Sequence, residues 1–372
     1  MTTREIRIDR SRPLTGQPET GHNRWHPDIP PILECDPGDE VILETRDALD
    51  GQLDPDATVA EVAAVDLAVV HPLTGPVFVA GAEPGDLLEV EILEVAPEPF
   101  GFTAQIPGFG FLADVFTEPY LVRWRIENGF ATSDDLPGVR VPGAPFMGTI
   151  GLTPGHELML RTREREQAAL DAGGAVLPPD PRGAVPATGA IAAEALRTIP
   201  PREQGGNVDI KHLVAGTRLF LPVDTPGALF SAGDAHFAQG DCEACGTAIE
   251  MAATLRVRFS FQPGAAAARG IRAPRFSREG SPSAAPVSEP AQYIATTGMP
   301  LTEDGENRPG DLSLAARNAL LAMIGELQER GFNRPQAYAL CSVAVDLKVS
   351  QVVDVPNVLV SAFLPLDIFD LA

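Results

Sequence analysis

The segment Ile-Leu-Glu-Cys-Asp-Pro-Gly-Asp-Glu-Val-Ile-Leu-Glu, residues 32–44, decides the fold class. Two short apolar runs flank Pro37-Gly38, and Pro-Gly fits the centre of a type II turn because glycine accepts a positive φ there. The same pattern returns at residues 83–92, where Glu-Pro-Gly-Asp leads into Leu-Leu-Glu-Val-Glu-Ile. Strand, tight turn and strand together predict hairpins of sheets that bury one or both faces.

Turn-forming residues continue along all 372 residues. Glycine and proline number 35 and 36, well above their usual share of roughly 12%. Because both residues interrupt helices, an apolar chain that contains so many of them favours many short strands. The sequence therefore predicts a β-rich protein.

One convincing helix stands out, over residues 311–330. Leu320, Ile324 and Leu327 follow the i, i+4, i+7 spacing of a buried helix face, and Gly331 can end the helix. Loop-like stretches near residues 160–200 and 262–290 suggest three parts. These are an N-terminal β-rich domain (1–160), a β-rich segment that carries an acidic and histidine cluster (161–262), and a C-terminal α+β portion with the helix (263–372).

Composition excludes several classes of function. The formal net charge is −23, which is the wrong sign for a nucleic-acid binder or for attachment to an anionic membrane surface. No apolar run approaches the ~18 residues of a membrane span, and Met1 to Arg10 lacks an apolar signal core, so we expect a cytoplasmic protein. Four cysteines do not make a disulfide framework.

The densest group of reactive side chains lies between Gly233 and Glu250. On a strand, Asp234 and His236 share one face, and Asp241 and Glu243 can do the same. Glu250 follows an apolar pair, as an inward-pointing acid does. Such groups cost free energy when buried alone, and a divalent cation would satisfy them. The alternative is a solvated acidic loop in a very acidic protein.

Other candidates are scattered along the chain. Asp47 and His71 end apolar strands, where side chains often line sites, although a lone histidine is more often structural. Asn207 and Asp209 share a face beyond Gly205-Gly206 if that segment is extended, and an ordinary capped turn is the alternative.

Cys242 and Cys245 form a Cys-x-x-Cys pair, typical of a redox dithiol or half of a zinc site. Because no second pair matches it, we treat this spacing as coincidental. The sequence contains no phosphate-binding loop, dinucleotide fingerprint or Gly-x-Ser-x-Gly motif.

Several ordered motifs along the chain carry a resemblance to a known family. They are His-Asn-Arg-Trp-His-Pro-Asp-Ile-Pro-Pro at 22–31, Pro-Gly-Asp at 37–39, His-Pro-Leu-Thr-Gly-Pro at 71–76, Gly-Ala-Glu-Pro-Gly-Asp at 81–86, Thr-Ile-Pro-Pro-Arg-Glu at 198–203, Gly-Gly-Asn at 205–207 and the 234–250 cluster. In these motifs the chain resembles the acetamidase/formamidase family, on the formamidase side. The resemblance is dense over about residues 20–260.

The resemblance implies an enzyme that hydrolyses short aliphatic amides to a carboxylate and ammonia. It also implies a mainly β fold, with β-sandwich and barrel-like parts and a smaller α+β portion, a homodimer or higher homo-oligomer, and a divalent metal, zinc first. Cys242 replaces a glycine of the family pattern, and Gln204 stands where asparagine is common. These departures leave the preferred amide open, small lactams included.

Nine residues receive roles in this hypothesis, in which a cation activates the attacking water. Those expected to hold the metal are Asp47, His71, His236 and Asp234. Those expected to act as base and acid are Glu250 and Glu243, and those expected to bind the substrate are Asn207, Gln239 and Asp209. Two alternatives stay open: a metal-free amidase that uses paired carboxylates, and a non-catalytic β-rich binding protein.

Overall fold

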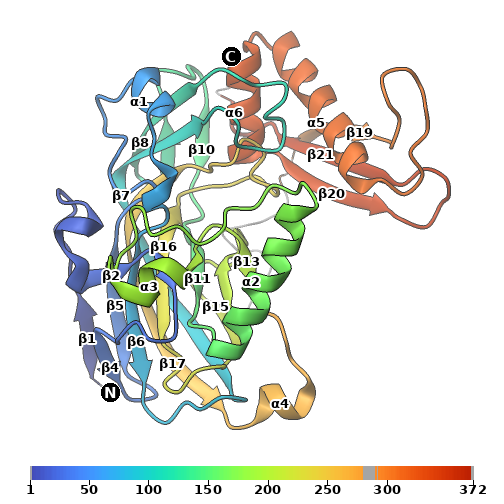
Figure 1. Ribbon diagram of the computed structural model, residues 1–372. Helices are drawn as coiled ribbons and strands as arrows, with labels where there is room; N and C mark the ends of the chain where they lie inside the picture. The colour runs from blue at the N-terminus through green and yellow to red at the C-terminus, as the bar shows by residue number, and fades with distance from the viewer. Residues whose placement is uncertain (1, 280–289, 291, 370–372) are drawn as a thin grey trace.

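The computed structural model describes residues 2–279, 290 and 292–369, and within them the protein is mainly β (Figure 1). One large sheet runs through the body of the molecule. Its central path, in spatial order, is β10 (Arg140–Pro142), β9 (Phe130–Thr132), β8 (Tyr120–Glu127), β7 (Leu87–Gln105), β17 (Glu250–Gln262), β16 (Phe230–His236), β11 (Phe146–Leu152), β14 (Gly205–Asn207) and β13 (Pro201–Arg202).

Seven further strands join this sheet beside the central path. They are β1 (Thr3–Ile6), β2 (Gly21–His22), β4 (Leu33–Cys35), β5 (Glu40–Thr45), β6 (Leu73–Val79), β15 (Thr217–Pro222) and β18 (Arg275–Arg278). A separate pair is formed by β3 (Arg24–Trp25) and β12 (Leu196–Arg197). Short helices accompany the sheet: α1 (Val59–Ala63), α2 (His156–Asp171), α3 (Gly189–Glu194), α4 (Ala265–Arg269) and the 3-10 turns at Leu14–Gly16, Pro18–Thr20 and Leu67–Val69.

The C-terminal part is a smaller α+β layer, as predicted. It has a three-stranded sheet in the order β19 (Tyr293–Gly298), β21 (Leu359–Pro365) and β20 (Asp346–Gln351), with α5 (Leu312–Glu329) and α6 (Arg334–Ala344). Figure 1 shows this layer beside the main body, with its strands extending outward. Strands from both 1–160 and 161–262 belong to the large sheet, so the division between those two predicted domains stays a prediction.

The predicted turns are confirmed, but the predicted hairpins are wrong. Gly38 and Gly85 have φ of 89° and 95°, and Asp39 N donates to Asp36 O at 3.1 Å. Within the described residues, however, the strands on either side of each turn do not pair: β4 pairs with β6, and β5 pairs with β1 and β17. A turn fixes where the chain reverses, whereas distant strands that bury more apolar surface decide the pairing.

The helix predicted at 311–330 is confirmed as α5. The Asp311 side chain accepts a hydrogen bond from Leu314 N at 2.9 Å and caps the first turn. The sequence missed α6, which begins with a capping box between Asn333 and Gln336. Part of the predicted 262–290 loop, residues 280–289, lies outside the described residues. No helix in the described ranges is both long and apolar enough to cross a bilayer.

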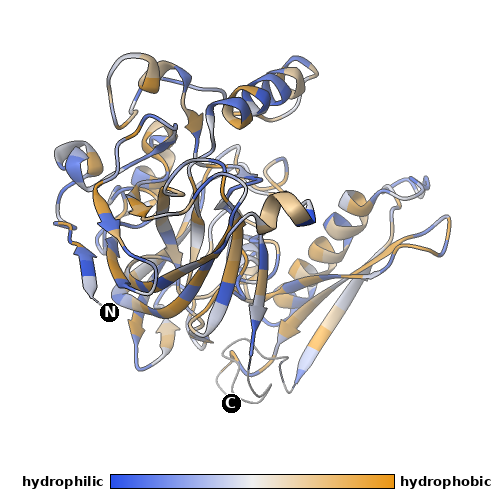
Figure 2. Ribbon diagram, turned by 90° about the horizontal axis from the view of Figure 1, so that it is seen from below, coloured by the Kyte–Doolittle hydropathy of each residue, from blue (hydrophilic) through white to orange (hydrophobic). Residues whose placement is uncertain are grey.

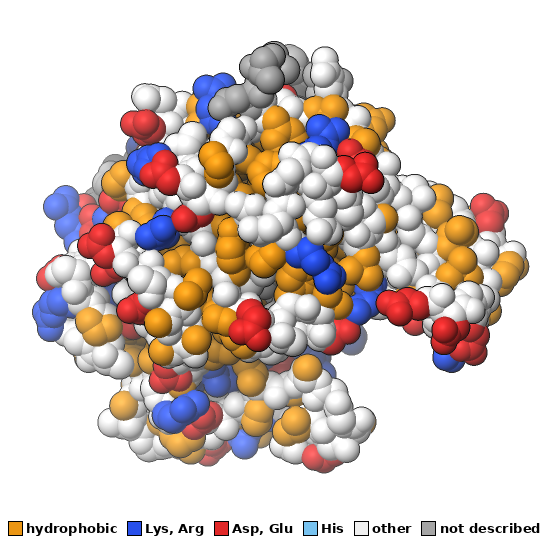
Figure 3. Space-filling model, turned by 90° about the horizontal axis from the view of Figure 1, so that it is seen from above, with side chains coloured by type: hydrophobic (Ala, Val, Ile, Leu, Met, Phe, Trp, Pro, Cys, Tyr) orange, Lys and Arg blue, Asp and Glu red, His pale blue; other side chains and the backbone are white. Residues whose placement is uncertain are grey.

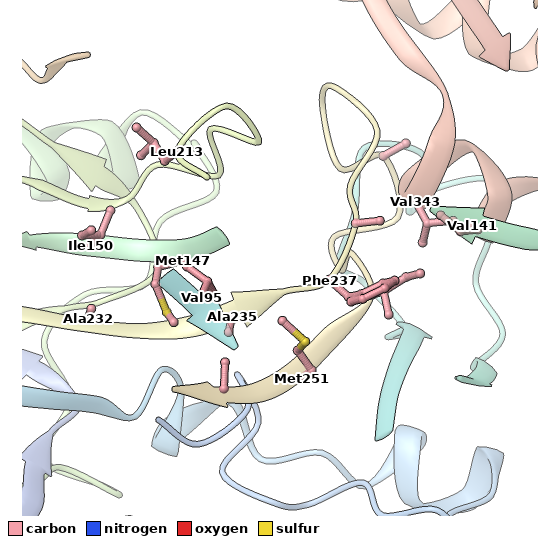
Figure 4. Close-up of a cluster of buried hydrophobic side chains, with 14 of the residues drawn as sticks. Val95, Val141, Met147, Ile150, Leu213, Ala232, Ala235, Phe237, Met251 and Val343 are labelled. Atoms are coloured by element: carbon pink, nitrogen blue, oxygen red, sulfur yellow. The ribbon is translucent and has the colours of Figure 1, made fainter. Parts of the chain in front are cut away.

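Strand β16 carries two of the reactive side chains, Asp234 and His236. Figure 4 shows Ala235 and Phe237 among the buried apolar side chains, together with Met147 of β11 and Met251 of β17. Asp234 has a positive φ of 57°, which interrupts the regular alternation between Ala232 and Ala235, and its carboxylate lies 3.3 Å from His236 Nε2. Figure 2 shows the same mixture of apolar and polar positions along the strands of the sheet.

The surface carries charges of both signs despite the net charge of −23. Figure 3 shows acidic and basic side chains interspersed, with apolar side chains between them. Several form ion pairs, such as Arg123 with Asp135 at 2.9 Å and Arg125 with Asp134 at 2.9 Å. Exposed pairs of this kind contribute little to stability, because water and salt screen the attraction.

Candidate active site

The site begins where β16 and β17 meet. His236 lies directly opposite Glu250 in the antiparallel register, and its Nε2 is 3.2 Å from Glu250 Oε2. The same Nε2 is 3.3 Å from Asp234 Oδ1 and 3.9 Å from Glu243 Oε1. One buried imidazole nitrogen therefore faces three carboxylates.

Gln239 fixes the orientation of His236. The Gln239 Nε2 donates to the Asp209 carbonyl at 2.9 Å, which leaves its Oε1 to accept from His236 Nδ1 at 2.8 Å. This assignment puts a proton on Nδ1, so the neutral ring presents the lone pair of Nε2 to the carboxylates. Both ends of the Gln239 amide are used by protein groups, so the structure does not direct this predicted substrate ligand into the cavity.

A second group of acids shares His236. Asp209, Asp234 and His236 offer ligand atoms that lie within 4.8 Å of one another, and His236, Glu243 and Glu250 do the same. Both groups can hold a metal ion. The structure thus brings together side chains that lie up to 41 positions apart in the sequence.

Residues on β11 and β14 support Asp234. Thr149 pairs with Asn207 across the two strands, and its Oγ1 is 2.8 Å from Asn207 Oδ1 and 3.1 Å from Asp234 Oδ2. The preceding Gly148 leaves room for the acids, because a Cβ there would lie 2.6 Å from Asp209 Oδ1 and 2.9 Å from Asp234 Oδ2. The sequence analysis missed both Gly148 and Thr149. A glycine within a strand was the available signal.

His71 approaches the same acids from another segment. Its Nε2 is 3.9 Å from Asp234 Oδ2, and its backbone N–H donates to Thr198 Oγ1. Among the described residues, His71 Nδ1 and Asp209 Oδ1 are buried polar atoms without a hydrogen bond. Buried polar atoms are usually paired, so these two are available to a ligand.

Burial controls the protonation of the group. Burial raises the pKa of Asp209 and of Glu250 to about 7 and raises that of Glu243 well above its usual value. For Asp234 burial acts in the same direction, but His71 and His236 outweigh it and lower the pKa. Burial alone would lower the pKa of His236, yet Glu250 and Asp234 raise it. Four clustered carboxyl groups need a positive partner to ionise together.

These groups open into a cavity of about 190 Å³. The polar residues that line it are His71, Asn207, Asp209, Asp234, Glu243, Thr247 and Glu250. The apolar residues that line it are Ala48, Leu49, Leu67, Val70, Ile106, Phe109, Ile199 and Pro201. A small cavity lined by both charged and apolar side chains is typical of an enzyme for small polar molecules.

Asp47 lies near this group, close enough for Asp234 to raise its pKa further after burial, but it does not line the same cavity. Its carboxylate accepts hydrogen bonds from Leu49 N at 2.9 Å and Gly51 N at 3.1 Å, within its own turn. Asp47 lines a different hollow, which it shares with Glu250. The structure therefore gathers His71, His236 and Asp234 but keeps the Asp47 carboxylate in a local turn.

The Cys-x-x-Cys pair is unbridged. Cys242 is exposed and Cys245 is buried, and both are free thiols. Burial raises the pKa of Cys245, so its thiolate, the reactive form, is disfavoured. This agrees with treating the spacing as coincidental.

Comparison with known proteins defines the class of the fold and the site. The chain superposes on the solved gamma lactamase from Delftia acidovorans with a TM-score of 0.93, at 36% identity and over 100% of this chain and 94% of that one. It is 36% identical over 363 residues to an acetamidase of Mycolicibacterium smegmatis (90% of this chain, 87% of that protein). It is also 36% identical over 386 residues to a formamidase of Methylophilus methylotrophus (98% and 93%). The chain is an amidase, a hydrolase of small amides.

The particular family follows directly. Residues 7–371 match the model of the Acetamidase/Formamidase family, and the chain belongs to this family. The resemblance seen in the sequence is thereby confirmed.

Proposed function

We propose that the protein hydrolyses the C–N bond of short aliphatic amides and small lactams, with a divalent cation among the acids that line the cavity. The observation that carries this proposal is a cluster of two imidazoles and four carboxyl groups beside a 190 Å³ cavity. His71 and the four acids line the cavity, and His236 lies directly behind them, within 4 Å of Asp234, Glu243 and Glu250. The lactam part draws on the likeness to the Delftia acidovorans protein. Acetamidase and formamidase relatives support the linear amides.

The donor set fits a cation. His71 Nδ1 and Asp209 Oδ1 are buried without a hydrogen bond among the described residues, and His236 presents Nε2 with its Nδ1 held by Gln239. A ring whose far nitrogen donates to an oxygen is the usual arrangement of a metal-bound histidine. His71, Asp234 and His236 would hold the ion, with Asp209 beside them. Zinc accepts this mixture of nitrogen and oxygen ligands. When bound, such an ion supplies polarisation of the amide carbonyl and a lowered pKa for water.

The acids perform the proton transfers in this proposal. Glu250, with its pKa raised to about 7, accepts a proton from the attacking water at Oε2 and later delivers it to the leaving nitrogen. Glu243, whose pKa burial raises, is the second acid within reach of that nitrogen. Water adds to the carbonyl carbon, the C–N bond breaks, and the nitrogen leaves as ammonia, or as an amine of the opened ring. Asn207 orients the amide, since it lines the cavity beside Thr149.

A metal-free amidase remains the second candidate. Its support is the position of His236 between Asp234 and Glu250, because a protonated imidazole there can offset two carboxylates without any ion. In that case a carboxylate pair acts directly on water and leaving group.

Removal of bound metal separates the two candidates. We expect dialysis against a chelator to abolish ammonia release from formamide and acetamide and to lower the thermal midpoint, because the buried acids lose their positive partner. Added zinc restores both properties, and elemental analysis before and after dialysis counts the ions. A stripped sample that retains full turnover and an unchanged midpoint would establish the metal-free candidate instead.

A comparison of Asp47→Asn with Asp234→Asn tests whether Asp47 is a metal ligand. We expect Asp234→Asn to reduce kcat/KM by about 10²-fold or more, since Asp234 faces both imidazoles. We expect Asp47→Asn to cost less than about tenfold and to lower stability by about 1 kcal/mol, as its turn loses hydrogen bonds. Steady-state kinetics and thermal melts check both. Equal losses of activity and bound metal in the two variants would restore Asp47 as a ligand.

The predicted homo-oligomer and the cytoplasmic location stay predictions. Light scattering of the purified protein measures the first, and cell fractionation measures the second.

A further inference from the structure

We infer that Phe109 is a specificity-determining residue that limits the size of the acyl or ring part of the substrate. The inference rests on the proposed amide hydrolysis and deepens it, because it concerns which amides the cavity accepts. It stands on the shape of the cavity and on the contacts of the loop that carries Phe109.

The cavity is larger than the smallest amides need. An apolar cavity of about 150 Å³ is large enough to hold benzene, whereas this one measures about 190 Å³. Formamide and acetamide fill only the part next to the acids. The remaining space adjoins Leu49, Val70, Ile106 and Phe109, which suits the hydrocarbon part of a longer, branched or cyclic amide.

Phe109 lies at the mouth of this apolar space. Of the residues that line the cavity, Phe109 and Pro201 are the exposed ones, and Phe109 is 36% exposed. Its ring lies over Gly246, where an added Cβ would be 2.5 Å from Phe109 Cδ1. Gly246 lines the same cavity as Glu243 and Glu250, so the ring packs against the segment that carries these two acids.

The loop holds the ring in place. Phe109 N donates to Ile106 O at 3.0 Å and Phe111 N donates to Ala244 O at 2.9 Å. The Tyr338 hydroxyl from α6 accepts from Leu112 N at 2.8 Å and donates to Ala244 O. These bonds tie the loop to the segment that carries Glu243, so the distance from the ring to the acids is fixed.

A fixed wall selects by size. When the acids bind the amide group, the hydrocarbon part of a larger substrate occupies the space lined by the apolar residues, Phe109 among them. A substrate that exceeds the space must displace the ring or withdraw its carbonyl from the acids. Both effects lower kcat/KM, and the difference between neighbouring substrates in an apolar pocket amounts to about 10- to 200-fold per methylene.

The test compares Phe109→Ala and Phe109→Trp with the control Phe111→Ala. Phe111 is on the same loop and 42% exposed, but it lines another hollow. The measured quantity is kcat/KM for cyclohexanecarboxamide divided by that for acetamide. We expect Phe109→Ala to raise this ratio at least tenfold, Phe109→Trp to lower it at least tenfold, and Phe111→Ala to leave it within a factor of two.

A ratio that stays constant in both Phe109 variants would overturn the inference. A second measurement separates this result from failure of the proposed function. Calorimetric dissociation constants of the same two amides, measured with the Glu250→Gln variant and with Phe109 changed in that background, require no turnover. If the wild type hydrolyses neither amide, a shifted ratio of dissociation constants supports Phe109 and an unshifted ratio refutes it.

Discussion

Replacement of His236 by alanine is expected to reduce kcat/KM by about 10³-fold or more. His236 Nε2 lies within 4 Å of Asp234, Glu243 and Glu250, and it is the residue common to both candidate metal-binding groups. In the metal-dependent proposal its loss removes a ligand of the ion, and in the metal-free alternative it removes the positive partner of the acids. Bound metal should fall in parallel with activity.

Because such a variant also leaves buried acids unpaired, its folding needs an independent check. Glu250→Gln keeps the size and shape of the side chain and removes only the ionisable group. We expect it to fold normally and to lose about 10²- to 10⁴-fold in kcat, the usual contribution of a general base. His212→Ala, at an exposed histidine, is the matched control and should retain wild-type kinetics. A folded His236→Ala protein with wild-type turnover would contradict the proposed site.

The second large effect is expected from Gly148→Ala. The added methyl group would lie 2.6 Å from Asp209 Oδ1, 2.7 Å from His236 Cε1 and 2.9 Å from Asp234 Oδ2. These atoms cannot withdraw easily, since Gln239 holds His236 and Thr149 holds Asp234. A displacement of about 1 Å in an active site can cost 10²-fold in rate, which is the loss we expect here.

The same substitution should lower stability by only about 1–3 kcal/mol, the usual cost of one extra methyl group in a packed interior. The control is Gly325→Ala in α5, where an added Cβ meets no atom within 4 Å and alanine favours the helix by about 1 kcal/mol. We therefore expect kinetics and thermal melts to show lower activity and stability for Gly148→Ala, and wild-type activity with equal or higher stability for Gly325→Ala. Metal content is measured for both variants. Activity of Gly148→Ala within threefold of the wild type would show that the acids have room to move.

Prediction from the sequence was strongest where local chemistry decides the outcome. The Pro-Gly turns at Gly38 and Gly85 form because glycine accepts positive φ. Helix α5 forms where its apolar spacing and its Asp311 cap indicate. The family motifs led to an amidase, and the match over residues 7–371 confirms it. The hairpin predictions failed because the partner of β5 is β17, more than 200 residues away in the chain.

The candidate site shows the same division. The sequence identified Asp234, His236, Glu243 and Glu250 because they lie close together in the chain. Asp234, His236 and Glu250 belong to strands, whereas Glu243 lies in the loop between β16 and β17. These residues meet His71 and Asp209 only because β11, β14, β16 and β17 lie side by side in the sheet. In the same arrangement Gly148 leaves the room that the acids occupy. Asp47 has the same chemistry as the other acids, but only its turn shows that its carboxylate is already hydrogen-bonded.

The sequence by itself therefore determined the mainly β character, the family and most of the reactive side chains, because turn chemistry, strand alternation and ordered motifs are local properties. Only the tertiary structure decided which carboxylates lie next to the His236 imidazole. It also decided that the Gln239 side chain orients this imidazole, and which apolar residues line the cavity beside the acids. The reason is physical: the pKa of each buried group depends on charges around it, and several of these come from other parts of the chain, such as His71 beside Asp234 and His236 beside Glu250.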